Sequence, residues 1–321
     1  MRLAGSFIIT LLVFLGKGEK ALEWNFGTEA TWKVERAGEG LEAIVDFNAK
    51  LMRLATGFQF TEGPVYAADG FLLFSDIPPQ RIYRLDLNGQ LSVFREQTGN
   101  GNGNCFDPKG HLLTCEGANK RVTRMNLKTN HLEVLASEYE GKPLNQPNDI
   151  IATRDGRIYF TDPVFGDLRL KTQPVEGVYL IRPDGSLVRI IADEKNQPKP
   201  NGLALSPDGK TLYTTDSQRN VVRAYSVNPD GTVSNGRDLG RMEGKDGAGD
   251  GMRVDENGNI YATGPDGLWI FAPDGRLLGH LILPEVPANC AFGGEKRDLL
   301  FLTARTSVYL LKVKVRGAPS P

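Results

Sequence analysis

The sequence predicts an all-β protein, and more specifically a six-bladed β-propeller, on three observations. From Leu41 onward, short runs rich in β-branched and aromatic residues alternate with Asp-Gly and Asn-Gly turns, as strands and hairpins do. Long amphipathic helical periodicity is absent. The turns recur with a period of about 40 to 50 residues, which is typical of propeller blades. Each repeated unit is therefore expected to be a four-stranded sheet.

Two classes of turn mark each unit, and each class would close one hairpin of a blade. The first class lies near Gly70, Gly110, Gly156, Gly209, Gly258 and Lys296. The second class lies between them, near Gly89, Thr129, Gly185, Gly231 and Gly275. The first class predicts six blades, which together occupy residues 41–315.

The last blade is expected to borrow a strand from the N-terminal part of the chain. Residues 307–313 read as its third strand, and no outer strand follows them. Residues 50–55 are the candidate for that outer strand, because pairing the two ends of the chain would remove the open edge between the first and last blades.

The N-terminal residues predict export. Arg2 supplies a positive charge, and the apolar run at residues 7–15 is too short to span a bilayer comfortably. Gly16-Lys17-Gly18 is a candidate cleavage site, and an uncleaved anchor is the alternative. We expect a signal peptide over residues 1–18, an extension of unreadable fold over residues 19–40, and a periplasmic or secreted protein.

Composition excludes some partners and some chemistry. A formal net charge of -1 offers no basic surface for nucleic acid, and 40% hydrophobic residues indicate a globular chain. Cys105, Cys115 and Cys290 are odd in number and lack metal-like spacing. A hairpin turn at residues 107–110 would set Cys105 opposite roughly Leu112, out of register for a bridge to Cys115, so buried free thiols are expected.

Four strand-start motifs place an oxygen-bearing side chain before a strand in four different units. These side chains belong to Glu62, Asn148, Asn201 and Asp250. Asn and Asp beside Gly or Pro are ordinary turn residues, but Glu62 is hard to explain that way. Because the innermost strands of all blades line one channel, the four side chains are expected to meet at its mouth. Such oxygen ligands suit Ca²⁺ first, with Mg²⁺, Mn²⁺ or Zn²⁺ as substitutes, and they argue against a structural zinc site.

Aspartates also end several strands, and we expect them to have a structural role. Asp76, Asp162 and Asp216 close similar apolar strands in three units. Because Asp readily accepts hydrogen bonds from turn backbone, we expect these three to satisfy backbone donors rather than carry chemistry.

The strand-start motifs resemble those of the gluconolactonase and senescence-marker-protein (regucalcin) family of six-bladed propeller hydrolases. The matching motifs are Phe60-Thr61-Glu62-Gly63-Pro64, Pro147-Asn148-Asp149, Pro200-Asn201-Gly202-Leu203-Ala204 and Asp250-Gly251-Met252, and the resemblance spans about residues 51–313. It implies that Glu62, Asn148, Asn201 and Asp250 surround a catalytic divalent cation, usually Ca²⁺, and that the reaction is hydrolysis of a sugar or other lactone. A sister group with the same site hydrolyses phosphofluoridate esters.

The expected chemistry assigns roles within this site. A hard cation would polarise the lactone carbonyl and activate water, so no covalent nucleophile is needed. Asp250 is the expected base, with Glu62 as the alternative. The resemblance also implies that Asn102 contacts substrate, although a flexible turn is the alternative. Asn148 would bind substrate as well as metal, and Asn145 could bind sugar hydroxyls unless it lies in a solvated loop.

Two other functions remain open at this point. The same cation could serve an organophosphate or aryl-ester hydrolase, or the propeller could bind a ligand without catalysis, because fold alone does not decide function. The expected partner is a small lactone, without nucleic acid and without membrane contact beyond an N-terminal anchor. Oligomeric state stays undetermined.

Export can be tested directly. We expect the mature protein to begin after about Gly18 and to be found in the periplasm or medium, because a short apolar segment behind a positive charge directs secretion. N-terminal sequencing checks this. Soluble cytoplasmic protein that begins at Met1 or Arg2 would contradict it.

Overall fold

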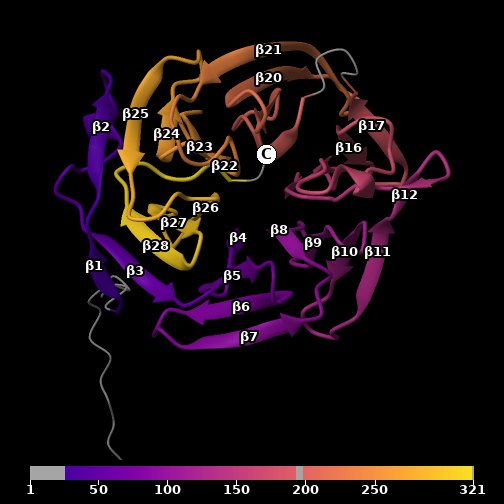
Figure 1. Ribbon diagram of the computed structural model, residues 1–321, viewed down its shortest axis with the longest axis horizontal. Coiled ribbons are helices and arrows are strands. Elements are labelled where there is room, and N and C mark those ends of the chain that lie inside the picture. The colour runs from indigo at the N-terminus through magenta and orange to yellow at the C-terminus, as the bar shows by residue number, and fades with distance from the viewer. Residues whose placement is uncertain (1–25, 193–197, 320–321) are drawn as a thin grey trace, which may run out of the picture.

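The structure is a computed structural model that describes residues 26–192 and 198–319. The predicted signal at residues 1–18, and residues 19–25 of the predicted extension, lie outside the described residues. Six antiparallel sheets surround a central axis (Figure 1), so the predicted six-bladed β-propeller is confirmed. In the first five blades the four main strands follow one another along the chain, with the innermost strand first, whereas the sixth blade takes its outer strand from the N-terminal part of the chain.

The strands of the first three blades fall where the turn pattern predicts them. The first blade contains β4 (Thr61–Tyr66), β5 (Phe71–Asp76), β6 (Arg81–Asp86) and β7 (Leu91–Glu96). The second contains β8 (Gly101–Phe106), β9 (Leu112–Glu116), β10 (Arg121–Met125) and β11 (Leu132–Ala136). The third contains β14 (Ile150–Ala152), β15 (Ile158–Asp162), β16 (Gly177–Ile181) and β17 (Leu187–Ile191), after a small hairpin of β12 (Glu138–Tyr139) and β13 (Lys142–Pro143).

The remaining blades repeat this plan. The fourth contains β18 (Pro200–Leu205), β19 (Thr211–Asp216), β20 (Val221–Val227) and β21 (Val233–Arg241). The fifth contains β22 (Met252–Val254), β23 (Ile260–Gly264), β24 (Gly267–Phe271) and β25 (Leu277–Ile282). The sixth contains β26 (Asn289–Gly293), β27 (Leu299–Ala304) and β28 (Ser307–Lys312), and its outer strand is β3 (Leu51–Thr56).

Ring closure by an N-terminal strand is confirmed. Strand β3 pairs antiparallel with β28, with Leu51 opposite Leu311 and Met52 opposite Leu310. Leu51 and Leu54 are buried in this blade. The first and last parts of the described chain therefore share one sheet.

The N-terminal extension has structure that its sequence did not reveal. Strand β1 (Thr28–Ala30) pairs with β3, and strand β2 (Lys33–Ala37) pairs with β25, so the extension adds a fifth strand to the sixth and fifth blades. Between these strands, the indole nitrogen of Trp32 donates to the carbonyl of Ala49 at 2.8 Å. Both strands are short and mostly exposed, so they carry no clear alternation of apolar and polar residues.

The core lies between adjacent blades, and the cysteines are part of it. Large apolar side chains from the middle strands fill these spaces, among them Trp269 and Tyr261. Cys105 lies opposite Leu113, one residue away from the predicted Leu112. The turn sets this register, because Asp107 N donates to the carbonyl of His111 and leaves a three-residue loop between them. All three thiols are free; two are buried and Cys105 is partly buried.

Helical structure is minimal. The described part of the chain has two helices, the 3₁₀ turns Leu41–Ala43 and Leu168–Leu170. Within the same residues, no helix has the length and apolar character needed to cross a membrane.

Removing β3 should open the ring. Deletion of residues 1–56 leaves β28 with an unpaired edge. It also removes Leu51 and Leu54, and burial of each of these leucines contributes about 1.5–3 kcal/mol to the free energy of unfolding. We expect the urea midpoint to fall sharply and the protein to aggregate. Deletion of residues 1–25 is the control and should leave the midpoint unchanged. Equal midpoints for the two deletions would contradict this account of closure.

Candidate functional site

The strand-start motifs converge on a cavity of ≈ 360 Å³ at one mouth of the central channel. The cavity wall includes all four predicted metal ligands and the predicted substrate ligand Asn102: Glu62, Asn102, Asn148, Asn201 and Asp250. Apolar residues, among them Phe60, Ile77 and Phe165, complete the wall. The site therefore combines converging oxygen atoms with an apolar rim.

Close packing of the innermost strands makes this convergence possible. A Cβ atom on Gly63 would overlap the main-chain oxygen of Asn102 in the next blade, and the residue has φ of 50°, which disfavours other residues. A Cβ atom on Gly202 would overlap the main-chain oxygen of Asp250. Glycine directly after the site residue therefore lets neighbouring blades meet at the axis.

Hydroxyl groups on the second strands hold the same backbone in place. Ser75 Oγ donates to the carbonyl of Asn102 at 2.7 Å, and Thr161 Oγ1 donates to the carbonyl of Asn201 at 2.8 Å. Each bond runs from one blade to the site residue of the following blade. The positions of the site residues thus depend on contacts between blades.

Glu62 is a buried carboxyl group with a raised pKa. Its Oε2 accepts hydrogen bonds from its neighbour Gly63 N at 2.6 Å and from Asn289 Nδ2 at 2.9 Å. Burial raises the pKa of Glu62 to about 7, and the charge of Asp149 acts in the same direction, while the two hydrogen bonds oppose the rise. The group therefore titrates near neutral pH when no cation is bound.

Asp250 is the second carboxyl group of the cavity. Burial, followed by the charge of Glu62, raises the pKa of Asp250 well above its ordinary value, while a hydrogen bond from the Asn201 side chain opposes the rise. The two carboxyl groups also act on one another, since Glu62 raises the pKa of Asp250 and Asp250 lowers the pKa of Glu62. They behave as one coupled pair rather than as two independent acids.

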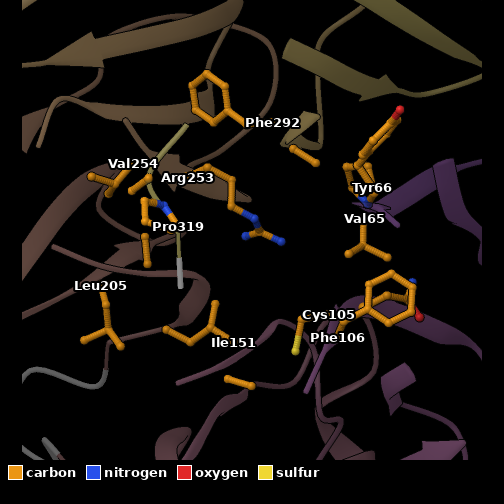
Figure 2. Close-up of a pocket in the computed structure, with 16 residues that line it drawn as sticks. Val65, Tyr66, Cys105, Phe106, Ile151, Leu205, Arg253, Val254, Phe292 and Pro319 are labelled. Carbon is orange, nitrogen blue, oxygen red and sulfur yellow. The ribbon is translucent and has the colours of Figure 1, made fainter. Parts of the chain in front are cut away.

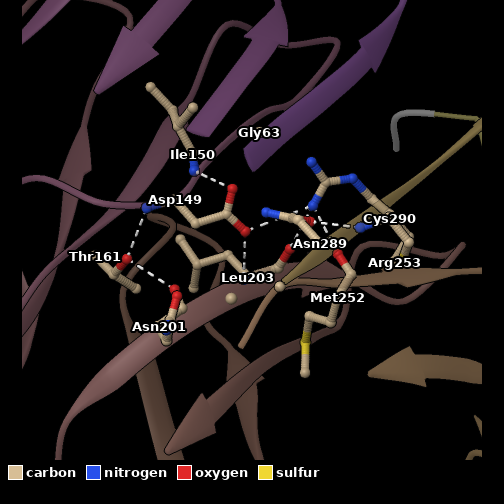
Figure 3. Close-up of polar contacts among 12 residues, drawn as sticks. Gly63, Asp149, Ile150, Thr161, Asn201, Leu203, Met252, Arg253, Asn289 and Cys290 are labelled. Atoms are coloured by element: carbon tan, nitrogen blue, oxygen red, sulfur yellow. Dashed lines mark hydrogen bonds and ion pairs between the residues drawn. The ribbon is translucent and has the colours of Figure 1, made fainter. Parts of the chain in front are cut away.

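Asp149 carries a third buried carboxylate behind the cavity wall (Figure 3). Its Oδ1 accepts from Ile150 N at 2.9 Å, its Oδ2 accepts from Leu203 N at 3.0 Å, and Arg253 Nη1 lies 3.5 Å from Oδ2. Sequence reasoning treated Asp149 only as part of a motif. The available signal was that it stands where Gly63, Gly202 and Gly251 follow the site residues in other blades.

Asn289 is a functional candidate that the sequence reasoning missed. It starts β26 in the sixth blade, is buried, and donates to Glu62. Its Oδ1 accepts from Cys290 N at 2.8 Å (Figure 3), which fixes the amide whose nitrogen donates to Glu62. The signal was Pro287-Ala288-Asn289, a Pro–Asn motif like those before Asn148 and Asn201 but with one residue inserted.

Asn145 lies outside the cavity, contrary to its predicted role. Its side chain has no exposed surface; the amide nitrogen donates to the carbonyls of Asp162 and Val175, and the oxygen accepts from the backbone N–H groups of Thr172 and Gln173. This amide joins two loops and has no capacity left for a sugar hydroxyl.

The strand-end aspartates have structural roles, and the histidines do not line the cavity. Asp76 accepts from the backbone of Gln59 and Phe60, and Asp162 accepts from Asn145 N, as predicted. Asp216 accepts from Gln218 N in the same way. The residues that line the cavity include none of His111, His131 and His280.

The donor set fits a hard divalent cation. Among residues 26–192 and 198–319, no group of three or more His, Cys, Asp or Glu side chains could hold a metal ion. The cavity instead offers two carboxylates with amide groups, and Ca²⁺ accepts both kinds of oxygen. Burial and neighbouring negative charge raise the pKa of both carboxyl groups, and a bound cation would offset that cost.

The fold and cavity together define a class: six-bladed propellers with an oxygen-lined site at one mouth of the channel. Residues 60–306 match the model of the family described as SMP-30/Gluconolactonase/LRE-like region, and the chain belongs to this family.

Relatives agree with this placement. A gluconolactonase from Zymomonas mobilis is 32% identical over 327 residues, which cover 93% of this chain and 91% of the relative. The solved structure of a gluconolactonase from Xanthomonas campestris is 30% identical with a TM-score of 0.81, and the match covers 90% of this chain and 97% of that chain. A calcium-binding regucalcin from Agrobacterium tumefaciens shares the fold, with a TM-score of 0.72 at 20% identity over 84% of this chain and 95% of that chain.

The raised pKa of Glu62 predicts how stability depends on pH when no cation is present. The pKa of Glu62 is about 7 in the folded protein and 4.5 ordinarily, so as pH rises this group loses its proton at lower pH in the unfolded chain than in the folded protein. The free energy of unfolding should therefore fall as pH rises from about 4.5 to about 7, and then level off.

Urea unfolding with a chelator present measures this dependence. Glu62→Gln should flatten the fall, because the amide does not ionise. His131→Ala is the control, since His131 lies outside the cavity. A Glu62→Gln profile identical to that of the unsubstituted protein would contradict the assignment.

Proposed function

We propose that the protein is a calcium-dependent lactone hydrolase. The observation that carries the proposal is the convergence of Glu62, Asn148, Asn201 and Asp250 in one cavity, together with membership of the family. Two similar proteins bear the name gluconolactonase, and a neighbour in fold is described as calcium-binding.

The same four residues would hold the cation, with Mg²⁺, Mn²⁺ or Zn²⁺ as substitutes. Bound there, a divalent cation supplies a Lewis acid that polarises a carbonyl oxygen and makes water more acidic. Asn289 keeps the Glu62 carboxylate in a fixed orientation, as hydrogen-bonded partners of metal ligands commonly do.

Asp250 is the better candidate for the base. Glu62 Oε2 already accepts two hydrogen bonds and the side chain is buried, whereas Asp250 is only partly buried. An accessible carboxylate can take the proton from a water molecule that attacks the lactone carbonyl. The rise in its pKa makes Asp250 a stronger proton acceptor than an ordinary aspartate.

Asn102 and Asn148 are placed to orient the substrate. Both line the cavity, and the backbone of Asn102 is fixed because its carbonyl accepts from Ser75 Oγ and from Asn104 Nδ2 at 2.9 Å. The backbone of Asn148 is fixed in turn, since Gly103 N donates to its carbonyl at 2.8 Å. Amide side chains on a rigid backbone suit hydrogen bonds to the ring oxygens or hydroxyls of a lactone.

An aryl-ester hydrolase is the second candidate, and the apolar rim favours it. Phe60 is 38% exposed and Phe165 is 37% exposed, and with Ile77 they line the same cavity. Exposed aromatic side chains at a cavity mouth offer a surface for an aromatic leaving group. The polar residues would act in the same way in both reactions.

Substitution of the two carboxylates tests the proposal. We expect Glu62→Gln and Asp250→Asn each to lower calcium affinity and kcat/KM for gluconolactone by about tenfold or more, because each removes a negative charge from the cation's ligands. Asn201→Ala should lower both less, since water can replace a neutral ligand. Calorimetric calcium titration and steady-state kinetics give the two values.

The controls separate catalysis from a structural metal. His111→Ala, His131→Ala and His280→Ala should keep most activity, because these side chains do not line the cavity. A chelator should abolish turnover while circular dichroism persists. Unchanged kinetics in both carboxylate variants would refute the site, and unfolding by chelator without prior activity would favour a non-catalytic propeller.

A further inference from the structure

A second cavity, of ≈ 240 Å³, lies at the opposite end of the innermost strands (Figure 2). Whereas Glu62 lines the first cavity, Val65 and Tyr66, further along the same strand β4, line the second. The other innermost strands contribute in the same way, and Ala318 and Pro319 form part of the wall. The channel therefore has a separate pocket at each end.

One charged side chain, Arg253, points into this second cavity (Figure 2). Its Nη1 donates to the carbonyl of Met252 at 2.6 Å and lies 3.5 Å from both Asp149 Oδ2 and the carbonyl of Leu203. Among the described residues, no partner is found for its Nε and Nη2. One edge of the guanidinium is therefore held, and the other is available to a ligand.

Asp149 only partly balances this charge. Its two carboxylate oxygens also accept backbone N–H bonds from Ile150 and Leu203, which disperse its negative charge. Its approach to Arg253 is 3.5 Å on the Nη1 side alone. The free Nε and Nη2 atoms can still form the two parallel bonds that a carboxylate makes with arginine.

Apart from Arg253 and Asn104, most side chains that line the cavity are apolar. Its wall includes Val65, Phe106, Ile151, Leu205 and Phe292. The thiol of Cys105 also lies there, and burial raises its pKa, so it stays uncharged. A guanidinium in such surroundings is poorly solvated, which favours an anion that brings its own apolar body. The volume lies below the range of about 300–1,000 Å³ of drug-sized ligand sites, so the ligand must be small.

We propose that this second cavity binds a small monocarboxylic acid, with the carboxylate on Arg253 and the apolar body against the surrounding side chains. The site is separate from the cavity at the other mouth and does not depend on whether that cavity hydrolyses lactones. An inorganic dianion fits less well, because the apolar wall offers it nothing in place of water.

Calorimetric titration with benzoate and with benzyl alcohol tests the proposal. The two probes share the ring and differ in the carboxylate. A chelator is present throughout, so that benzoate cannot bind through a metal ion at the other mouth. We expect one benzoate site, with affinity at least about tenfold higher than for benzyl alcohol.

Substitutions then locate the site. Arg253→Met should weaken benzoate binding by at least about tenfold and leave benzyl alcohol within about twofold. Arg182→Met is the matched control, since Arg182 is also paired with an aspartate, Asp230, but lies outside the cavity. If Arg253→Met fails to fold because Asp149 loses its partner, Ala291→Leu fills the cavity without changing charge and should weaken benzoate to the same extent.

Three results would overturn the proposal. One is the absence of benzoate binding at millimolar concentration. Another is equal affinity for benzoate and benzyl alcohol, which would show that Arg253 does not recognise the carboxylate. The third is benzoate binding that Ala291→Leu, and Arg253→Met where it folds, leave unchanged, which would place the bound acid elsewhere.

Discussion

Burial of carboxylates at the propeller axis is the constraint on which the rest of the site depends. Glu62 and Asp149 are buried and Asp250 is partly buried, and the charge of Asp149 raises the pKa of both Glu62 and Asp250. Asp149 is compensated by two backbone N–H groups and by Arg253. Within the described part of the chain, the pair formed by Glu62 and Asp250 has only neutral donors, Gly63 N, Asn289 and Asn201, so its charge is incompletely balanced. On the function proposed here, that imbalance would favour a bound cation.

The positions of the site residues depend on contacts between blades rather than on any single blade. Each site residue lies at or just before the start of an innermost strand. The backbone carbonyls of Asn102, Asn201 and Asp250 each accept from a hydroxyl on the second strand of the preceding blade. Thr215 Oγ1, for example, bonds the carbonyl of Asp250. Closure of the sixth blade by β3 completes these contacts around the axis. A defect in closure far from the cavity is therefore expected to loosen the ligands as well as lower stability.

Features that recur from blade to blade could be predicted from the sequence, whereas features that depend on one insertion or one tertiary contact could not. Propeller architecture, and the convergence of Glu62, Asn148, Asn201 and Asp250 on one cavity, were readable because the same turn and strand-start patterns recur at similar spacing. Asn289 was missed because an inserted residue separates it from its proline. Asn145 was misassigned because its burial depends on a loop at Thr172 and Gln173, which is distant in sequence. Strands β1 and β2 were unreadable because their pairing with β3 and β25 is tertiary, and short exposed strands leave little periodicity.

The ion pair between Asp149 and Arg253 lies between the two cavities, because Arg253 lines the second and Asp149 follows Asn148, which lines the first. Asp149 follows the proposed ligand Asn148 on one side and faces Arg253 on the other. If the carboxylate of a bound acid draws Arg253 away from Asp149, the negative charge of Asp149 is less neutralised. That charge then acts more strongly on Glu62 and Asp250. A cation at the first mouth would then be held more tightly, since it would face more negative charge. Thermodynamic reciprocity requires the converse, so a cation bound at one mouth must favour an acid at the other by the same factor.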